Sequence, residues 1–387
     1  METMIELACR RRHSLFTVAL FLFIIGAVFS EANGIGDYLC QSFTLNVGEL
    51  LIQKSPISYY RAGILGLLLI KIALDLLDHY KLSFFQILIL VLVVAQALIS
   101  HGRGLLFLFV FAIAAHDVDI KLISKVLLLT LSASIGIVAF LALGGFIEEI
   151  ISEGGQWYRT VRRSLGFVNQ NTLALYLLSL IYACFVLFEP KLKTFLGLIL
   201  IAAVGFFLSG SRGLVLGLFS LISTFYIFKA SNPTFRRFIV FLFPLIVICD
   251  LVFLYQFSYG PIEAYFDKLS SYRFSYVCRV IQELPITFFG DPSFFTEDSD
   301  PFDNCYAWCL LVFGIVGTTV FLLSVFLGLL KHVDNITLLS ICSTICLIGF
   351  IESRMSDPVM SFPIIKILLD GWDTQFLKNE FAQIAKT

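Results

Sequence analysis

The sequence predicts an all-α, polytopic integral membrane protein. Hydrophobic residues make up 58% of its 387 residues, charged residues make up only 14%, and the mean hydropathy is +0.91. These values lie far outside the range of soluble globular domains. Apolar runs near the ~20 residues that cross a bilayer recur along the whole chain. We therefore expect residues 1–387 to form a single membrane domain, without an internal repeat.

The hydropathy pattern indicates about twelve transmembrane helices. We expect spans at residues 14–30, 60–78, 83–100, 104–115, 124–145, 167–188, 194–209, 213–229, 236–257, 305–330, 336–351 and 358–377. The first run follows Arg10, Arg11 and Arg12, and no small-residue cleavage site comes after it, so we expect an uncleaved helix rather than a signal peptide. An even number of spans places both termini on one side of the membrane.

Basic residues set the expected orientation of these spans. The short loops on the side of the N-terminus carry Lys81, Lys121 and Arg236 among others, and the positive-inside rule makes this side cytoplasmic. The opposite side carries mostly arginine, whose planar guanidinium binds phosphate in a bidentate manner. Some of these arginines have an alternative use, which is to pair with nearby acidic residues such as Glu149.

Two extracytoplasmic loops are substantial, at residues 146–166 and 258–304. The second contains four prolines and is long enough to carry short helices. The cytoplasmic loops are all short, so the sequence leaves no room for a cytoplasmic domain. Any chemistry therefore belongs to the outer face.

A charged segment at residues 159–171 lies between two apolar runs and includes three arginines. A guanidinium at the bilayer is costly unless it faces an anion or a water-filled cavity. Helices that run inward from Phe167, Gly213 and Asp303 turn the positive ends of their dipoles toward this outer face. Capping explains an Asn or Asp at such an end, but the positive charge of Arg212 opposes the dipole. A bound anion would relieve that opposition.

The same segment resembles a motif of Wzy-type O-antigen and exopolysaccharide polymerases, R-x-S-x-G-F-x-[NH]-P-N. Here it reads Arg162-Arg163-Ser164-Leu165-Gly166-Phe167-Val168-Asn169-Gln170-Asn171. The family's S-x-S-R-[GT] turn resembles Ser209-Gly210-Ser211-Arg212-Gly213. The opening of the family's large outer loop resembles Ser271-Tyr272-Arg273. The end of that loop resembles Asp303-Asn304-Cys305-Tyr306 followed by Gly314-Ile315-Val316-Gly317. The resemblance covers roughly residues 155–360.

The chain departs from the family pattern at three positions. Gln170 replaces the proline of the first motif, and Gly290-Asp291-Pro292 lacks the second glycine of the loop's G-x-G. Asp303 stands where the related ligase branch carries a histidine. The last departure disfavours a histidine-based ligase, although it is compatible with polymerisation.

The resemblance implies a polysaccharide polymerase, a glycosyltransferase of the bacterial cytoplasmic (inner) membrane. It would transfer a growing glycan from undecaprenyl diphosphate onto the non-reducing-end sugar of a lipid-linked repeat unit, in O-antigen, capsule or exopolysaccharide biosynthesis. The implied partners are this lipid-linked oligosaccharide, the bilayer, a chain-length regulator and a flippase, with no nucleic acid. No cofactor or metal is implied, because arginines would neutralise the diphosphate.

The resemblance and the charges together give roles to individual residues. The expected catalytic residues are Asp303, as general base or alternatively as a helix cap, and Arg212 and Arg273, which with Arg162 clamp the diphosphate. The expected substrate-binding residues are Arg162, Arg163, Asn169, Asn171, Asn304 and Glu352. Two alternatives stay open, since Arg163 would equally pair with Glu149 or Glu153, and the asparagines Asn169 and Asn171 would equally form hydrogen bonds between helices.

Two other functions remain as alternatives. One is an O-antigen ligase-like glycan transferase, and the other is a flippase or transporter of lipid-linked oligosaccharide. A flippase should carry charges along a central path, whereas here only Lys71, Asp75 and Lys366 lie within spans away from the outer face. Lys71 and Asp75 are one helical turn apart, and we expect them to form a structural ion pair rather than a proton relay.

Overall fold

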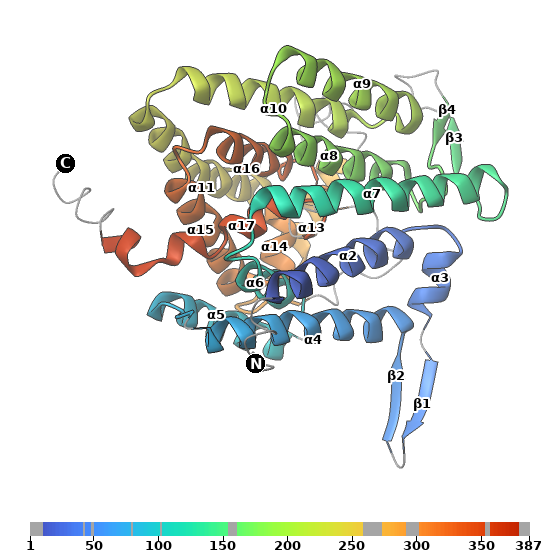
Figure 1. Ribbon diagram of the computed structural model, residues 1–387, viewed down its shortest axis with the longest axis horizontal. Coiled ribbons are helices and arrows are strands. Elements are labelled where there is room, and N and C mark those ends of the chain that lie inside the picture. The colour runs from blue at the N-terminus through green and yellow to red at the C-terminus, as the bar shows by residue number, and fades with distance from the viewer. Residues whose placement is uncertain are drawn as a thin grey trace, which may run out of the picture. The chain divides into compact units, whose positions relative to one another are not determined.

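α-Helices dominate the computed structural model (Figure 1). The structure describes residues 11–41, 43–47, 50–78, 80–100, 103–153, 161–257, 273–291, 302–352 and 357–378. Within these ranges, seven helices are long and apolar enough to cross a membrane. The coarse prediction of an all-α protein built from apolar helices is confirmed, and two short β hairpins add to it. The number of spans stays a prediction.

Most predicted spans correspond to one helix each. The seven long apolar helices are α2 (Arg12–Ser30), α7 (Ile120–Leu143), α8 (Gln170–Leu187), α9 (Leu192–Ser209), α10 (Arg212–Ala230), α11 (Pro233–Gln256) and α15 (Gly314–Lys331). Three apolar helices are shorter: α5 (Phe84–Ser100), α6 (Gly104–Ala114) and α16 (Ile336–Ile348). A further helix, α4 (Pro56–Leu77), is 22 residues long and carries Lys71 and Asp75.

The chain divides into two compact units. The first comprises Met1–Tyr80 and Asp117–Phe219, and the second comprises Lys81–His116 and Ser220–Thr387. The boundary between residues 219 and 220 lies inside α10, so this helix begins in the first unit and ends in the second. The prediction of a single membrane domain over residues 1–387 stays a prediction.

In the first unit, α8 is the most buried of the long helices. It packs on α7 and α9, while α7 packs on α2 and α2 packs on α4 (Figure 1). The apolar window of α8 is 72% buried, the highest share among the seven long helices. The smaller elements of this unit are α3 (Ile35–Cys40), β1 (Phe43–Val47), β2 (Leu50–Lys54), β3 (Ile151–Glu153) and β4 (Val161–Arg163). The two hairpins, β1–β2 and β3–β4, are antiparallel.

In the second unit, α15 is the central helix and contacts α5, α11, α14 (Cys305–Val312), α16 and α17 (Phe362–Ile367). The segment expected to be a large loop carries one described helix, α13 (Arg273–Glu283), which packs on α11 and α14. Leu254 of α11, Val277 and Ile281 of α13, and Leu311 of α14 share one buried apolar cluster. These contacts fix the end of α11 beside the start of α14.

The predicted span 305–330 is two helices, α14 and α15, and the prediction of a single helix was wrong. The break is at Gly314, whose φ of +68° is left-handed, and Gly290, with φ of +83°, packs directly against it. The segment that carries Gly290 hydrogen-bonds across the break, with the Ile315 N–H donating to the Thr287 carbonyl at 3.1 Å. Backbone groups freed by the break are thus satisfied by a distant segment. Neither glycine has room for a side chain.

The predicted span 358–377 is also interrupted, so the prediction of a single helix was wrong here too. The chain forms α17, then the short 3₁₀ helix η3 (Asp370–Trp372). His332 Nε2 lies 2.7 Å from the Asp370 carboxylate, and the Trp372 indole N–H donates to Ser324 Oγ at 2.8 Å. These polar contacts join η3 to Ser324 of α15 and to His332, the residue that follows α15. They hold residues 370–372 in a short 3₁₀ turn.

Replacing Gly314 with alanine should destabilise the protein. A Cβ at this left-handed position would meet the backbone of residues 288–290, and such overpacking costs about 1–3 kcal/mol. We expect a lower apparent Tm in detergent for Gly314→Ala. The matched control is Gly136→Ala, because Gly136 lies inside α7 with open space around it. Equal Tm values for the two variants would contradict this account of the break.

Candidate functional site

The charged segment predicted at residues 159–171 ends in a fixed turn before α8. Leu165 (φ +48°) and Gly166 (φ +87°) are both left-handed and reverse the chain. The Asn33 N–H donates to the Gly166 carbonyl at 2.8 Å, and the Val168 N–H donates to the Glu31 carbonyl at 2.9 Å. The turn is therefore held against the residues that follow α2. Arg159 lies outside the described residues.

Asn169 caps α8. Its side-chain oxygen accepts from the Thr172 N–H at 2.9 Å and from Thr172 Oγ1 at 3.2 Å, which satisfies a donor left free in the first helical turn. Asn171, two residues later, accepts a hydrogen bond from Arg162 Nη2 at 3.2 Å through Oδ1. The first asparagine thus shapes the helix end, and the second holds an arginine.

Arg162 joins two motifs that are far apart in the sequence. Its Nε donates to the Ser209 carbonyl at 2.7 Å, at the end of α9, while its Nη2 is held by Asn171. The Arg162 side chain also packs on Gly210, where a Cβ would lie 2.9 Å from both Cγ and Nε of the arginine. Gly210 has φ of +61°, so glycine serves both the turn and this close packing. Arg162 thereby lies against the turn that leads into Arg212.

Arg212 is the first residue of α10, and its side chain is exposed. Neither α8 nor α10 has an acidic residue in its first turn, which is where acidic residues usually complement the helix dipole. The start of α8, the turn at residues 209–211 and the start of α10 thus combine two arginines with two helix N-termini.

Arg163 points to a different partner. Its Nε and Nη2 donate to the two oxygens of Glu149 at 2.9 and 2.7 Å, and this hydrogen-bonded pairing raises the pKa of Arg163 above its ordinary value. The alternative predicted from the sequence, a pair with Glu149, is therefore present. The pair is partly exposed, so its effect on stability is small.

The second unit contains Asn304, which caps α14. Its Oδ1 accepts from the Ala307 N–H at 2.9 Å, and its Nδ2 donates to Asp250 Oδ2 at 3.0 Å. Asp303, the predicted general base, precedes it and is half-buried, as is Glu352 after α16. Arg273 begins α13, but its side chain lies outside the described residues. The catalytic and binding roles given to these residues stay predictions.

Lys71 belongs to a buried ionic cluster in the first unit. Its Nζ lies 2.5 Å from Asp75 Oδ2 and 2.5 Å from Asp117 Oδ1. Arg12 Nε lies 3.5 Å from Asp75 and 3.3 Å from Asp117, and Arg12 also pairs with Asp78. The predicted structural pair of Lys71 and Asp75 is thus confirmed, within a larger network that joins the start of α2, the end of α4 and the residues before α7.

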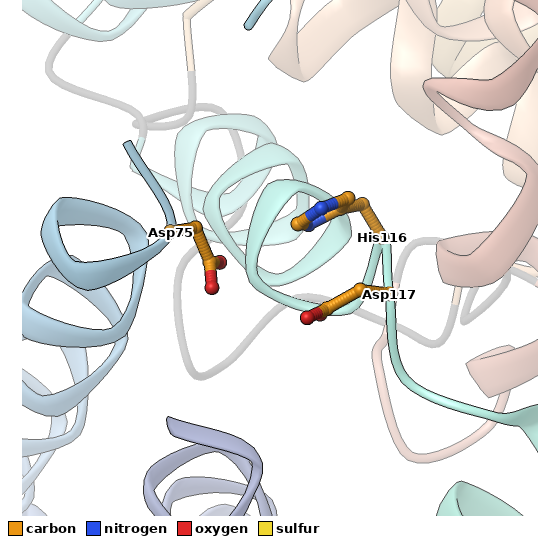
Figure 2. A group of neighbouring side chains, drawn as sticks. All are labelled: Asp75, His116 and Asp117. Atoms are coloured by element: carbon orange, nitrogen blue, oxygen red, sulfur yellow. The ribbon is translucent and has the colours of Figure 1, made fainter. Parts of the chain in front are cut away.

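Asp75 and Asp117 of this cluster are candidate ligands for a metal ion. Asp75 and Asp117 point into a common space in Figure 2, which also draws His116, the residue before Asp117. Carboxylate and imidazole are metal ligands. However, the Lys71 ammonium lies between the two carboxylates and takes the position that a cation would occupy. We therefore assign this cluster to structure.

Sequence reasoning missed two carboxylates that the structure brings into contact with predicted residues. Asp250, the partner of Asn304, is the only acidic residue of α11. A lone carboxylate within an apolar span is itself a signal, because such residues are costly there and usually functional. Asp117, the second partner of Lys71, falls in a loop, and no local pattern distinguishes it.

The fold and the apolar helices together define the class of this chain, an α-helical membrane protein. Comparisons with protein-family models, with curated proteins and with solved structures find no match. The function therefore has to be argued from the chain's own residues.

Removing the Lys71 ammonium should strongly destabilise the protein. Lys71→Met would leave the buried Asp75 and the half-buried Asp117 with Arg12 as their remaining cation, and breaking a buried ion pair costs about 3–5 kcal/mol. The double variant Lys71→Met/Asp75→Asn removes one charge of each sign and should recover much of the loss. Apparent Tm in detergent measures both effects. A double variant no more stable than Lys71→Met would contradict the pairing.

Proposed function

We propose that this chain is a polysaccharide polymerase that joins oligosaccharide repeat units carried on undecaprenyl diphosphate, at the outer face of the bacterial cytoplasmic membrane. The observation that carries the proposal is the contact of Arg162 with Ser209 and Asn171, since it unites the two motifs that resemble those of Wzy-type polymerases. Arg212 follows directly from that turn. An anion-binding role would account for the positive charge of Arg212 at the N-terminus of α10.

The chemistry of the reaction fits residues of this kind. The diphosphate of the donor is already a good leaving group, so the protein mainly has to bind it, stabilise the charge that develops on it and orient the acceptor hydroxyl. In the proposal, Arg162 and Arg212 of the first unit bind the diphosphate. Guanidinium groups form bidentate hydrogen bonds with phosphate oxygens and keep their charge at any physiological pH.

The proposed topology has about twelve spans and both termini in the cytoplasm. The contacts of the first unit support the part of this topology from α2 to α9, because the chain after α2 meets the turn before α8, and Arg162 meets the end of α9. A chain that crosses the membrane with each successive long helix would bring these ends to one side. The ionic cluster of Lys71 joins the opposite ends of α2, α4 and α7.

The alternative of a flippase receives less support. A transport path would leave Lys71 and Asp75 available to a substrate, whereas each is held by oppositely charged neighbours at 2.5–3.5 Å. The ligase-like alternative shares the proposed donor site and differs in its acceptor. The assay below separates these functions by their products.

The proposal predicts that purified protein in nanodiscs converts a synthetic undecaprenyl-diphosphate-linked repeat unit into a ladder of longer glycans, without nucleotide or added metal. Arg162→Ala and Arg212→Ala should each lower the rate by about 10²-fold or more, as expected for loss of a group that stabilises developing charge. Gel electrophoresis of the products measures the rate.

The matched control is Arg61→Ala, because Arg61 is an exposed arginine of α4 in the same unit that has no proposed role. Its ladder should equal that of the wild type. If wild-type protein makes no ladder but moves the intact lipid-linked unit across a liposome bilayer, the chain is a transporter and the proposal is wrong.

A further inference from the structure

Asp250 is an unusual residue for its position. It is the only acidic residue of α11, a helix that is long and apolar enough to cross a membrane. Its neighbours on the same helix, Leu251 and Leu254, belong to the apolar cluster formed with α13 and α14. A carboxylate in such surroundings is costly unless it is paired or has a function.

The partner of Asp250 is an amide rather than a cation. Asn304 Nδ2 donates to Asp250 Oδ2 at 3.0 Å, and within the described residues Asp250 forms no ion pair. Tyr306, a nearby hydroxyl on α14, donates to the Cys346 carbonyl at 2.5 Å instead. One amide hydrogen bond leaves most of the acceptor capacity of a carboxylate unused.

Asn304 also fixes the direction of this contact. Its Oδ1 is engaged by the Ala307 N–H at the start of α14, so only its Nδ2 can face the carboxylate. Asp250 is thereby held in one orientation by a helix cap on another element. The side chain is half-buried, so it remains reachable. A positioned and reachable carboxylate without a cation can accept hydrogen bonds from hydroxyl groups of a ligand.

We infer that Asp250 binds the acceptor saccharide through a hydroxyl group and takes the proton of that hydroxyl during glycan transfer. This inference rests on the proposed polymerase function and extends it by naming the proton acceptor. Asn304 is then a positioning residue that holds the carboxylate. The ligand class at this site is a sugar with a free hydroxyl.

The step balances without a co-reactant. The acceptor oxygen forms a bond to the anomeric carbon of the donor glycan as the bond from that carbon to the diphosphate oxygen breaks. The electron pair of the broken bond leaves with the lipid diphosphate. The hydroxyl proton passes to the Asp250 carboxylate and from there to water.

The main rival for this role is Asp303, the general base expected from the sequence. It lies next to the capping residue Asn304 and is also half-buried. The two carboxylates lie on different elements. Asp250 is on the long helix α11, and Asp303 is in the segment before the short helix α14. Variants of both residues are therefore needed in one experiment.

The experiment compares wild type, Asp250→Asn, Asp250→Glu and Asp303→Asn in nanodiscs. Ladder formation measures turnover, and binding of undecaprenyl diphosphate measures whether the fold and donor site persist. We expect Asp250→Asn to lower turnover by about 10²–10⁴-fold with unchanged lipid binding, as for loss of a general base. Asp250→Glu should retain part of the activity, because it keeps the carboxylate.

A second measurement reports on the site without requiring turnover. Dicyclohexylcarbodiimide, which adds to carboxylic acids in apolar surroundings, should modify Asp250, as mapped by peptide mass spectrometry. The lipid-linked repeat unit should slow this modification. If wild-type protein makes no ladder, the polymerase proposal fails, while protection by the saccharide still supports the hydroxyl site.

Three results would overturn the inference. Normal turnover in Asp250→Asn would remove its role as proton acceptor. Loss confined to Asp303→Asn would give that role to Asp303. Absence of carbodiimide modification, or modification that the saccharide does not slow, would show that Asp250 is part of the closed core.

Discussion

An apolar helix bundle has to satisfy its charges and its free helix ends within the protein, because lipid offers them no hydrogen bonds. The described residues meet this constraint repeatedly with cations at the carbonyl ends of helices. Arg162 donates to the Ser209 carbonyl at the end of α9, and Lys366 donates to the Ala115 and His116 carbonyls just after α6, at 3.1 and 2.6 Å. A cation at this end also complements the helix dipole. The arginine that defines the candidate site is therefore part of the architecture as well.

Three cations of the first unit, Lys71, Arg162 and Arg163, have different partners in the structure. Lys71 is enclosed by carboxylates, which fits a purely structural role. Arg162 donates hydrogen bonds to the Ser209 carbonyl and to the Asn171 amide oxygen, and it lies against the turn that precedes Arg212. Arg163, which lies on the same strand as Arg162, donates two hydrogen bonds to the Glu149 carboxylate.

Hydropathy located most of the helices, because length and apolar composition are local properties of the chain. It missed the break at Gly314, since that break depends on Gly290 and on hydrogen bonds from a distant segment. The caps were also accessible locally, as Asn304 shows at the start of α14. Its contact with Asp250 was not accessible, because 54 positions separate the two residues and no spacing rule relates them. Sequence pattern thus finds elements and caps, whereas the partners of buried charges require the tertiary structure.

The central claim is that Arg162 of β4 and Arg212 at the start of α10 bind the diphosphate of a lipid carrier. The most direct test is native mass spectrometry of the protein with undecaprenyl diphosphate and undecaprenyl monophosphate, for wild type and Arg162→Lys. Lysine keeps the charge but loses the bidentate geometry. The account predicts that wild type prefers the diphosphate and that the variant loses this preference while remaining folded. Equal binding of both lipids by wild type, or an unchanged preference in the variant, would contradict it.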